Sequence, residues 1–141
     1  MLTYAVQKVG DDYQQTEPQG ETNLIAFMAA IDAFPWSEQH QQWDETQDGP
    51  LPALVLQNEA DKRQLWVTLL GTDRAGEYQL QSISMQMRKS LFGKGKLEQD
   101  ATVADAPSRG VVDRLCELFC DGQYEALDRE VRRLVEAGDD D

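Results

Sequence analysis

The side chains with the strongest chemistry in this 141-residue chain are two cysteines and a single histidine. Cys116 and Cys120 are spaced i, i+4, which places one above the other on a helix. A closed zinc site needs four ligands in closely spaced pairs, and His40 is the only histidine that could add to the two thiols. The pattern therefore favours two free thiols packed in or beside the core, with no metal site and no structural disulfide.

Nucleophilic catalysis and phosphate binding also lack a sequence signature. His40 would be the base of any Ser–His or Cys–His pair, but it lies in the polar run 38–42, and no serine sits in a Gly-x-Ser-x-Gly elbow. The run Gly93-Lys94-Gly95-Lys96 offers amides and cations, yet a P-loop needs Gly-x-x-x-x-Gly-Lys-Ser/Thr between a strand and a helix. The paired carboxylates lie in polar runs, where no apolar pocket shifts a pKa. We therefore predict no enzyme activity and no catalytic, metal-ligating or cofactor-binding residue.

The charge is distributed unevenly along the chain. The net charge is −13, with −10 in residues 1–61, +4 in residues 62–99 and −7 in residues 100–141. An acidic surface repels phosphate groups, which argues against nucleic acid and anionic membrane surfaces as ligands. It suits a cationic protein partner, although an acidic surface also serves solubility alone.

Two features bear on where the protein is found. No stretch approaches the roughly 18 uncharged apolar residues that a membrane-spanning helix needs. The first residues lack a basic start followed by an apolar run, so no signal peptide is expected. We expect a cytoplasmic protein.

The elements that must position these side chains follow from the hydrophobic periodicity. It predicts one α+β domain over residues 1–138, in the order β-α-β-β-β-(β)-α-α, followed by an acidic tail at 139–141 that frays. The short connections indicate an antiparallel sheet, with the helices packed mainly on one face. The expected strands are residues 2–7, 53–57, 63–70, 77–87 and 97–103, and the expected helices are 24–34, 108–122 and 124–138.

The third central strand changes phase. Tyr78 and Leu80 have even numbers, whereas Ile83 and Met85 have odd numbers. Because strand side chains alternate with period two, one apolar face cannot change parity without an extra residue, which predicts a β-bulge near Gln81–Ser82.

Three segments lack strong periodicity. Residues 10–20 are polar and predict a loop, and residues 88–96 predict a basic, glycine-rich hairpin tip. Residues 36–52 predict a single helical turn capped by Ser37, followed by an acidic turn region. Gly122 and Gly138 are expected to end the last two helices.

The tryptophans are the best candidates for a binding surface. Trp36 and Trp43 bracket an acidic polar segment, so they either pack within that segment or anchor a partner. Trp66 lies on the strand face opposite Leu65 and Val67, where that segment or a partner covers it, or where it stays an exposed anchor. We select six residues as the protein-binding surface: Trp36, Trp43, Asp44, Glu45, Asp48 and Trp66.

The order of these elements resembles that of small immunity proteins from bacterial toxin–immunity systems. The similar features span residues 2–125: the first strand, the loop with Gly10 and Pro18, the helix 24–34, Phe34-Pro35-Trp36, Leu65-Trp66-Val67, and Leu118-Phe119-Cys120-Asp121-Gly122. The resemblance implies a non-enzymatic inhibitor that binds a cognate toxin and masks its active site. The basic segment 88–96 departs from that pattern and leaves the toxin class open.

A second interpretation is a secretion chaperone or adaptor that dimerises and holds a client protein. Such chaperones are also small and acidic and combine helices with a sheet. A monomer with one tight, basic partner would indicate an immunity protein, whereas a symmetric dimer on an extended client would indicate a chaperone.

Overall fold

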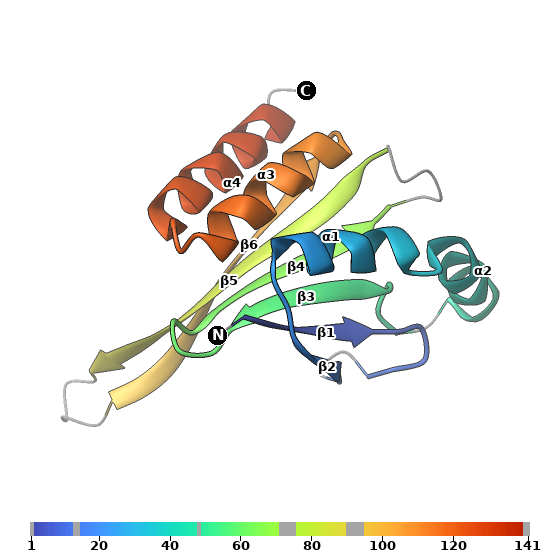
Figure 1. The fold of residues 1–141 in the computed structure, drawn as a ribbon, viewed down its shortest axis with the longest axis horizontal. Coiled ribbons are helices and arrows are strands. Elements are labelled where there is room, and N and C mark those ends of the chain that lie inside the picture. Colours follow the sequence, from blue (N-terminus) through green and yellow to red (C-terminus); the bar gives the residue numbers. More distant parts are fainter. Residues whose placement is uncertain (1, 13–14, 48, 71–75, 90–94, 140–141) are drawn as a thin grey trace.

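The structure is a computed structural model that describes residues 2–12, 15–47, 49–70, 76–89 and 95–139. The strands are β1 (Thr3–Gln7), β2 (Glu17–Glu21), β3 (Ala53–Asn58), β4 (Arg63–Leu69), β5 (Tyr78–Lys89) and β6 (Gly95–Ala106), and the helices are α1 (Leu24–Ala33), α2 (Trp36–Thr46), α3 (Arg109–Cys120) and α4 (Tyr124–Asp139). The strands form one antiparallel sheet in the order β2-β1-β3-β4-β5-β6. Helices α1, α3 and α4 lie over one face, and α2 lies at the end of the sheet (Figure 1). The predicted α+β fold is confirmed.

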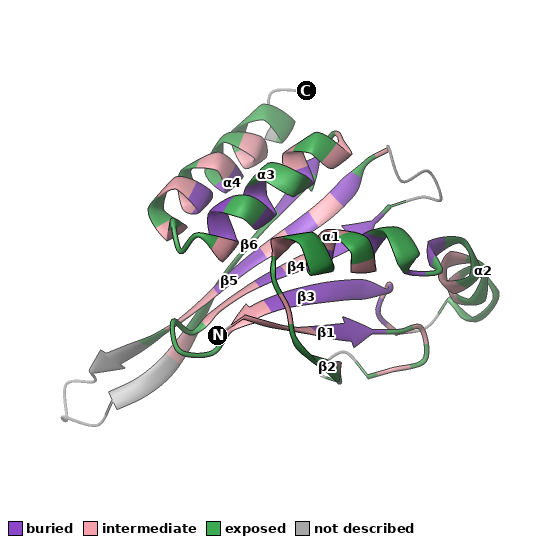
Figure 2. Cartoon of the chain, in the orientation of Figure 1, coloured by how far each residue is buried: buried purple, intermediate pink, exposed green. Residues whose placement is uncertain are grey.

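Strand alternation decides which face of the sheet is buried. In β4, Leu65, Val67 and Leu69 point toward the helices and are fully buried. They meet Leu115 and Phe119 of α3 in one continuous core, which lies between the helix layer and the sheet (Figure 2). The opposite face of the sheet carries no helix (Figure 1).

The first helix follows its sequence signals. The Asn23 side chain accepts a hydrogen bond from the Ala26 N–H at 2.9 Å, which caps the helix start. Phe27 and Ile31 are buried against the sheet, and the helix ends before Pro35. The predicted helix 24–34 is confirmed within one residue.

The two C-terminal helices meet at a tight turn. Gly122 has φ +72°, and the N–H of Gln123 donates to the Leu118 carbonyl at 2.9 Å. This is a left-handed termination that favours glycine, as predicted for Gly122. The predicted end of the last helix at Gly138 is one residue short, since α4 runs to Asp139. Residues 140 and 141 of the predicted tail lie outside the described residues.

The predicted loop at 10–20 is wrong over its second half, because β2 begins at Glu17. This strand pairs only with β1 and forms an edge of the sheet, a place where Pro18 is tolerated. The register shifts between Tyr4 and Ala5, next to Gly20 with φ +103°. Backbone hydrogen bonding to β1 at the sheet edge therefore outweighs the preference of this polar segment for a loop.

The single turn predicted after Pro35 is also wrong, since α2 has 11 residues, and its N-cap is Pro35 rather than Ser37. Side-chain contacts with the rest of the domain hold this polar helix, among them a hydrogen bond that Gln39 Oε1 accepts from the Val9 N–H at 2.8 Å. The Trp36 indole N–H donates to the Ile31 carbonyl at 2.9 Å, and His40 Nε2 lies 2.6 Å from the Leu69 carbonyl. Docking onto the end of the sheet stabilises a helix that its own composition does not favour.

The predicted β-bulge near Gln81–Ser82 is wrong as well. Pairing of β5 is continuous with β4 from Tyr78 to Ser84 and with β6 from Tyr78 to Lys89. The apolar side chains instead change face, since Tyr78 belongs to the core under the helices and Ile83 lines the opposite face.

The strand predicted at 97–103 is confirmed within the longer β6. Pairing of Arg88 with Lys96 and of Lys89 with Gly95 makes β5 and β6 a hairpin, as predicted for this basic segment. Beyond Ser84 the two strands pair with each other and extend past the rest of the sheet (Figure 1). Residues 90–94 lie outside the described residues.

Candidate binding face

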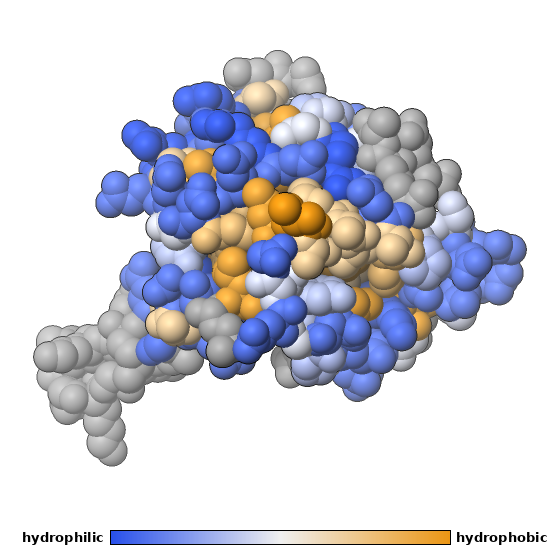
Figure 3. Space-filling view, in the orientation of Figure 1, coloured by the Kyte–Doolittle hydropathy of each residue, from blue (hydrophilic) through white to orange (hydrophobic). Residues whose placement is uncertain are grey.

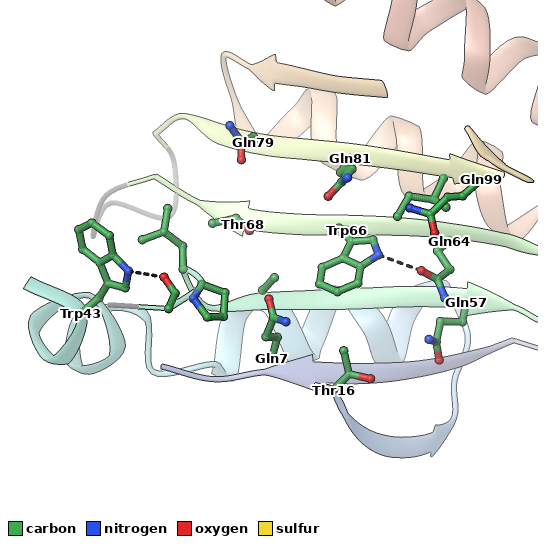
Figure 4. Close-up of a pocket in the computed structure, with 15 residues that line it drawn as sticks. Gln7, Thr16, Trp43, Gln57, Gln64, Trp66, Thr68, Gln79, Gln81 and Gln99 are labelled. Carbon is green, nitrogen blue, oxygen red and sulfur yellow. Dashed lines mark hydrogen bonds between the residues drawn. The ribbon is translucent and has the colours of Figure 1, made fainter. Parts of the chain in front are cut away.

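The sheet face opposite α1, α3 and α4, the open face, carries no helix, and Figure 4 views it with α1 behind the strands. Its part over β1 and β3 is covered, since Ala5, Ala53 and Val55 are buried there. The face is hollowed, with a volume of about 730 Å³. This volume lies within the range of small-molecule and peptide sites. The described lining residues are Gln7, Thr16, Trp43, Gly49, Pro50, Leu51, Ala53, Gln57, Gln64, Trp66, Thr68, Gln79, Gln81, Ile83 and Gln99.

None of these fifteen lining residues is charged, in a chain of which 28% is charged. Six are glutamines and two are threonines. Gln7 is only 4% exposed, and its Nε2 donates to the Asp12 and Gln15 carbonyls, so the other five glutamines supply the accessible amides. A glutamine amide both donates and accepts hydrogen bonds, as a peptide group does. The face can therefore pair with the polar groups of a polypeptide without burying a charge.

Trp66 lies on the central strand β4, in the middle of the open face. It pairs across the sheet with Val55 of β3 and Gln81 of β5. Its indole N–H donates to the Gln64 side-chain oxygen at 3.0 Å (Figure 4). This hydrogen bond fixes the orientation of a half-buried ring that borders the hollow.

Trp43 reaches the same hollow from the C-terminal half of α2. Its indole N–H donates to the Gly49 carbonyl at 3.1 Å, and its ring is half-buried (Figure 4). Asp44 and Glu45 follow it on α2 and are exposed. The structure therefore brings Trp43 and Trp66 to one hollow, and Asp44 and Glu45 are not among the residues that line it.

One predicted site residue, Trp36, lies in the core rather than at the hollow. Trp36 is only 1% exposed and packs on Phe34, with the ring centroids 4.5 Å apart. Its ring is part of the core and is not accessible to a partner. Asp48 lies outside the described residues.

Sequence reasoning missed the glutamines. The chain has fifteen of them in no tract, and the fold gathers six on the open face: Gln7, Gln57, Gln64, Gln79, Gln81 and Gln99. Their signal is period-two alternation with buried residues, as in Gln79-Leu80-Gln81 and Gln64-Leu65-Trp66.

His40, Arg63 and Asp128 have structural contacts. His40 Nε2 faces the Leu69 carbonyl, and the His40 ring stacks on Trp36 at 6.5 Å between centroids. Asp128 pairs with Arg63 at 2.6 Å, and Arg63 also lies over the Tyr124 ring. Across the described parts of the chain, no three metal-ligating side chains come together.

The two free thiols provide a test of the packing of α3. Burial raises the pKa of the Cys116 thiol, and burial and the Asp121 carboxylate raise the pKa of Cys120 to about 11. Since the thiolate is the reactive form, we expect Cys116 to resist a colorimetric thiol reagent near pH 8 and Cys120 to react slowly. Both should react fully in guanidinium. Fast labelling of both thiols in the native protein would contradict this packing.

Within the described residues, no helix is long and apolar enough to cross a bilayer. Comparison with protein-family models, curated protein sequences and solved structures found no significant match to this chain. The geometry of the face itself is therefore the evidence that bears on function.

Proposed function

We propose that this chain is a non-enzymatic, cytoplasmic binding protein that holds a protein partner against the open face of its sheet. The observation that carries the proposal is a hollow whose described lining residues are all uncharged and include two tryptophans and six glutamines, in a chain with net charge −13. Tryptophan is enriched among the residues that dominate binding energy at protein interfaces. The surrounding amides supply directional contacts without the cost of desolvating an ion.

The partner is proposed to be basic. Residues 1–61 carry a net charge of −10, and the exposed Asp44 and Glu45 lie beside Trp43. Such a field raises the rate at which a cationic protein arrives, and the neutral hollow then fixes it. We call the exposed pair Asp44 and Glu45 the acidic rim. An immunity protein that inhibits a cognate toxin fits this division between an acidic rim and a neutral anchor site.

Capture from the native host tests the proposal. The tagged protein and a Trp66→Ala variant are each incubated with host extract, and the retained proteins are identified by mass spectrometry. We expect one basic protein on the wild type and its loss from the variant. Retention of the same proteins by both would show that this face is not the binding site. If the partner is a toxin, one equivalent of the wild-type protein should abolish its activity.

The acidic rim gives a separate kinetic prediction. Replacing Asp44 and Glu45 by their amides should slow association with the captured partner by about 3- to 10-fold and flatten its salt dependence. The dissociation rate should change little, because rim charges act mainly on encounter. Surface plasmon resonance over a series of salt concentrations measures both rates.

A matched control removes charge from the helix side of the molecule. Glu117 on α3 and Glu125 on α4 are exposed, and their double amide variant should leave association nearly unchanged. If the rim and control variants associate equally slowly, overall charge rather than the rim determines encounter.

A dimeric secretion chaperone or adaptor is the second candidate function. The observation that favours it is an exposed apolar surface on α1, with Ile25 82% exposed. In such a dimer the open face of each copy would hold part of an extended client.

A further inference from the structure

Helix α1 is apolar on every side, although one side is exposed. Nine of its ten residues are apolar, and Asp32 is the exception. Two of its residues, Phe27 and Ile31, are fully buried on the side that packs against the core, whereas Ile25 is 82% exposed. Figure 3 shows the resulting hydrophobic patch within a largely hydrophilic surface. A helix that is apolar all round is normally covered on both sides, so this surface has the character of an interface.

The exposed residues of α1 form a self-complementary set: Ile25, Ala26, Ala29, Asp32 and Ala33. On a helical wheel they lie within an arc of about 120° centred on Ala29. If two copies of the helix cross antiparallel at Ala29, Ile25 of each lies opposite Ala33 of the other, and Ala26 lies opposite Asp32. The one large exposed side chain thus meets a small one, and alanine at the crossing point allows close approach of the axes.

The charges of this surface also fit a second copy. Asp32 lies in the last turn of α1, at the negative end of its own helix dipole, and the first turn carries no acid. In the antiparallel pair each Asp32 lies beside the positive end of the other helix. Asp32 is also paired with Arg109 at 2.6 Å, so no unpaired ion enters the contact. The remaining charge of each copy is screened over about 8 Å at physiological salt.

We propose that α1 is the interface of a two-fold symmetric homodimer, in which the helices pack antiparallel across Ala29. An isologous interface requires a surface that complements itself, and the α1 set has this symmetry. The helix layer then faces the dimer axis, and the two open sheet faces stay accessible for a partner. This dimer does not depend on what the open face binds.

The oligomeric state of the purified protein is the test. Size-exclusion chromatography with light scattering, at concentrations on the order of 100 µM, should give twice the chain mass of 15.9 kDa. Ala29→Arg places two like charges on the axis and should give a monomer. Because Ala29 is exposed and arginine is a good helix former, the variant should keep its circular dichroism spectrum and its thermal midpoint.

The matched control is the same substitution on another helix. Ala137 is exposed near the end of α4, and Ala137→Arg should remain a dimer. A monomeric wild type overturns the proposal, as does an Ala29→Arg variant that dimerises like the wild type. Loss of dimer in Trp66→Ala with retention in Ala29→Arg would place the interface on the open sheet face instead.

Cross-linking tests the position of the axis. Ala29 of one copy lies opposite Ala29 of the other, within the roughly 4.4–6.8 Å Cα separation that a disulfide spans. Ala29→Cys should therefore give a covalent dimer on mild oxidation, and Ala137→Cys should not. Cys116 and Cys120 are present in both variants, so the difference reports the new thiol alone. Equal cross-linking of the two variants would overturn the assigned axis.

Discussion

Replacing Trp36 with alanine should destabilise the fold by about 3–5 kcal/mol. The side chain is 1% exposed, and it packs on Phe34 where α2 joins the core. The substitution leaves a cavity and also removes the indole N–H that the Ile31 carbonyl accepts. This loss is a large part of the 5–15 kcal/mol typical of a whole domain. The measurement is the free energy of unfolding from urea titration, followed by circular dichroism.

Two control variants locate the cause of this loss. Trp36→Phe keeps most of the apolar volume but not the hydrogen bond, so it should lie between the wild type and Trp36→Ala. Trp43→Ala removes a half-buried ring at the other end of α2 and should cost less than half as much. A change within about 0.5 kcal/mol for Trp36→Ala, as at an ordinary surface position, would contradict the docking of α2.

The elements with strong periodicity could be predicted from the sequence. In β4, Leu65, Val67 and Leu69 alternate with Gln64, Trp66 and Thr68, so the aliphatic face was expected to be buried. In α1, Thr22 or Asn23 marks the start and Pro35 forces an end near Phe34. The structure has its N-cap at Asn23 and its C-cap at Phe34. For these elements, local propensity and the tertiary structure favour the same conformation.

The errors arose where tertiary contacts outweigh local signals. The polar sequence of α2 does not show that His40 will meet the Leu69 carbonyl on a strand 29 residues away. The parity change in β5 was taken as a bulge because only one face of the sheet was assumed to accept apolar residues. Ile83 packs on the open face instead, and the ladder stays regular.

Prediction of the candidate site was limited in the same way, because local sequence does not show which residues the fold brings together. Residue type selected Trp43 and Trp66, but it gave no means to separate them from Trp36, which flanks the same segment. The glutamines were missed because they lie on five strands and become neighbours only when the sheet forms (Figure 4). Sequence reasoning therefore selected two tryptophans that line the hollow, whereas the fold was needed to show the uncharged residues around them.

Trp66→Ala should lower affinity for the captured partner by about 30-fold or more, which corresponds to a hot-spot loss of about 2 kcal/mol. The effect should appear mainly as faster dissociation, because the ring lies at the centre of the hollow and makes contacts only after encounter. The half-exposed ring contributes less to folding, so stability should fall by only about 1–2 kcal/mol. Surface plasmon resonance gives the rates, and urea unfolding gives the stability.

Two variants on the same face test whether Trp66 is the anchor. Trp66→Phe keeps an aromatic ring but loses the hydrogen bond to Gln64, so it should restore part of the affinity. Val103 pairs with Gln81 across the strands and is 50% exposed near the edge of the face, where Val103→Ala should change affinity less than threefold. If Val103→Ala costs as much as Trp66→Ala, binding energy is spread evenly over the face. If neither Trp66→Ala nor Val103→Ala changes dissociation while the Asp44 and Glu45 amide variant slows association, the partner contacts the acidic rim of α2 rather than the sheet.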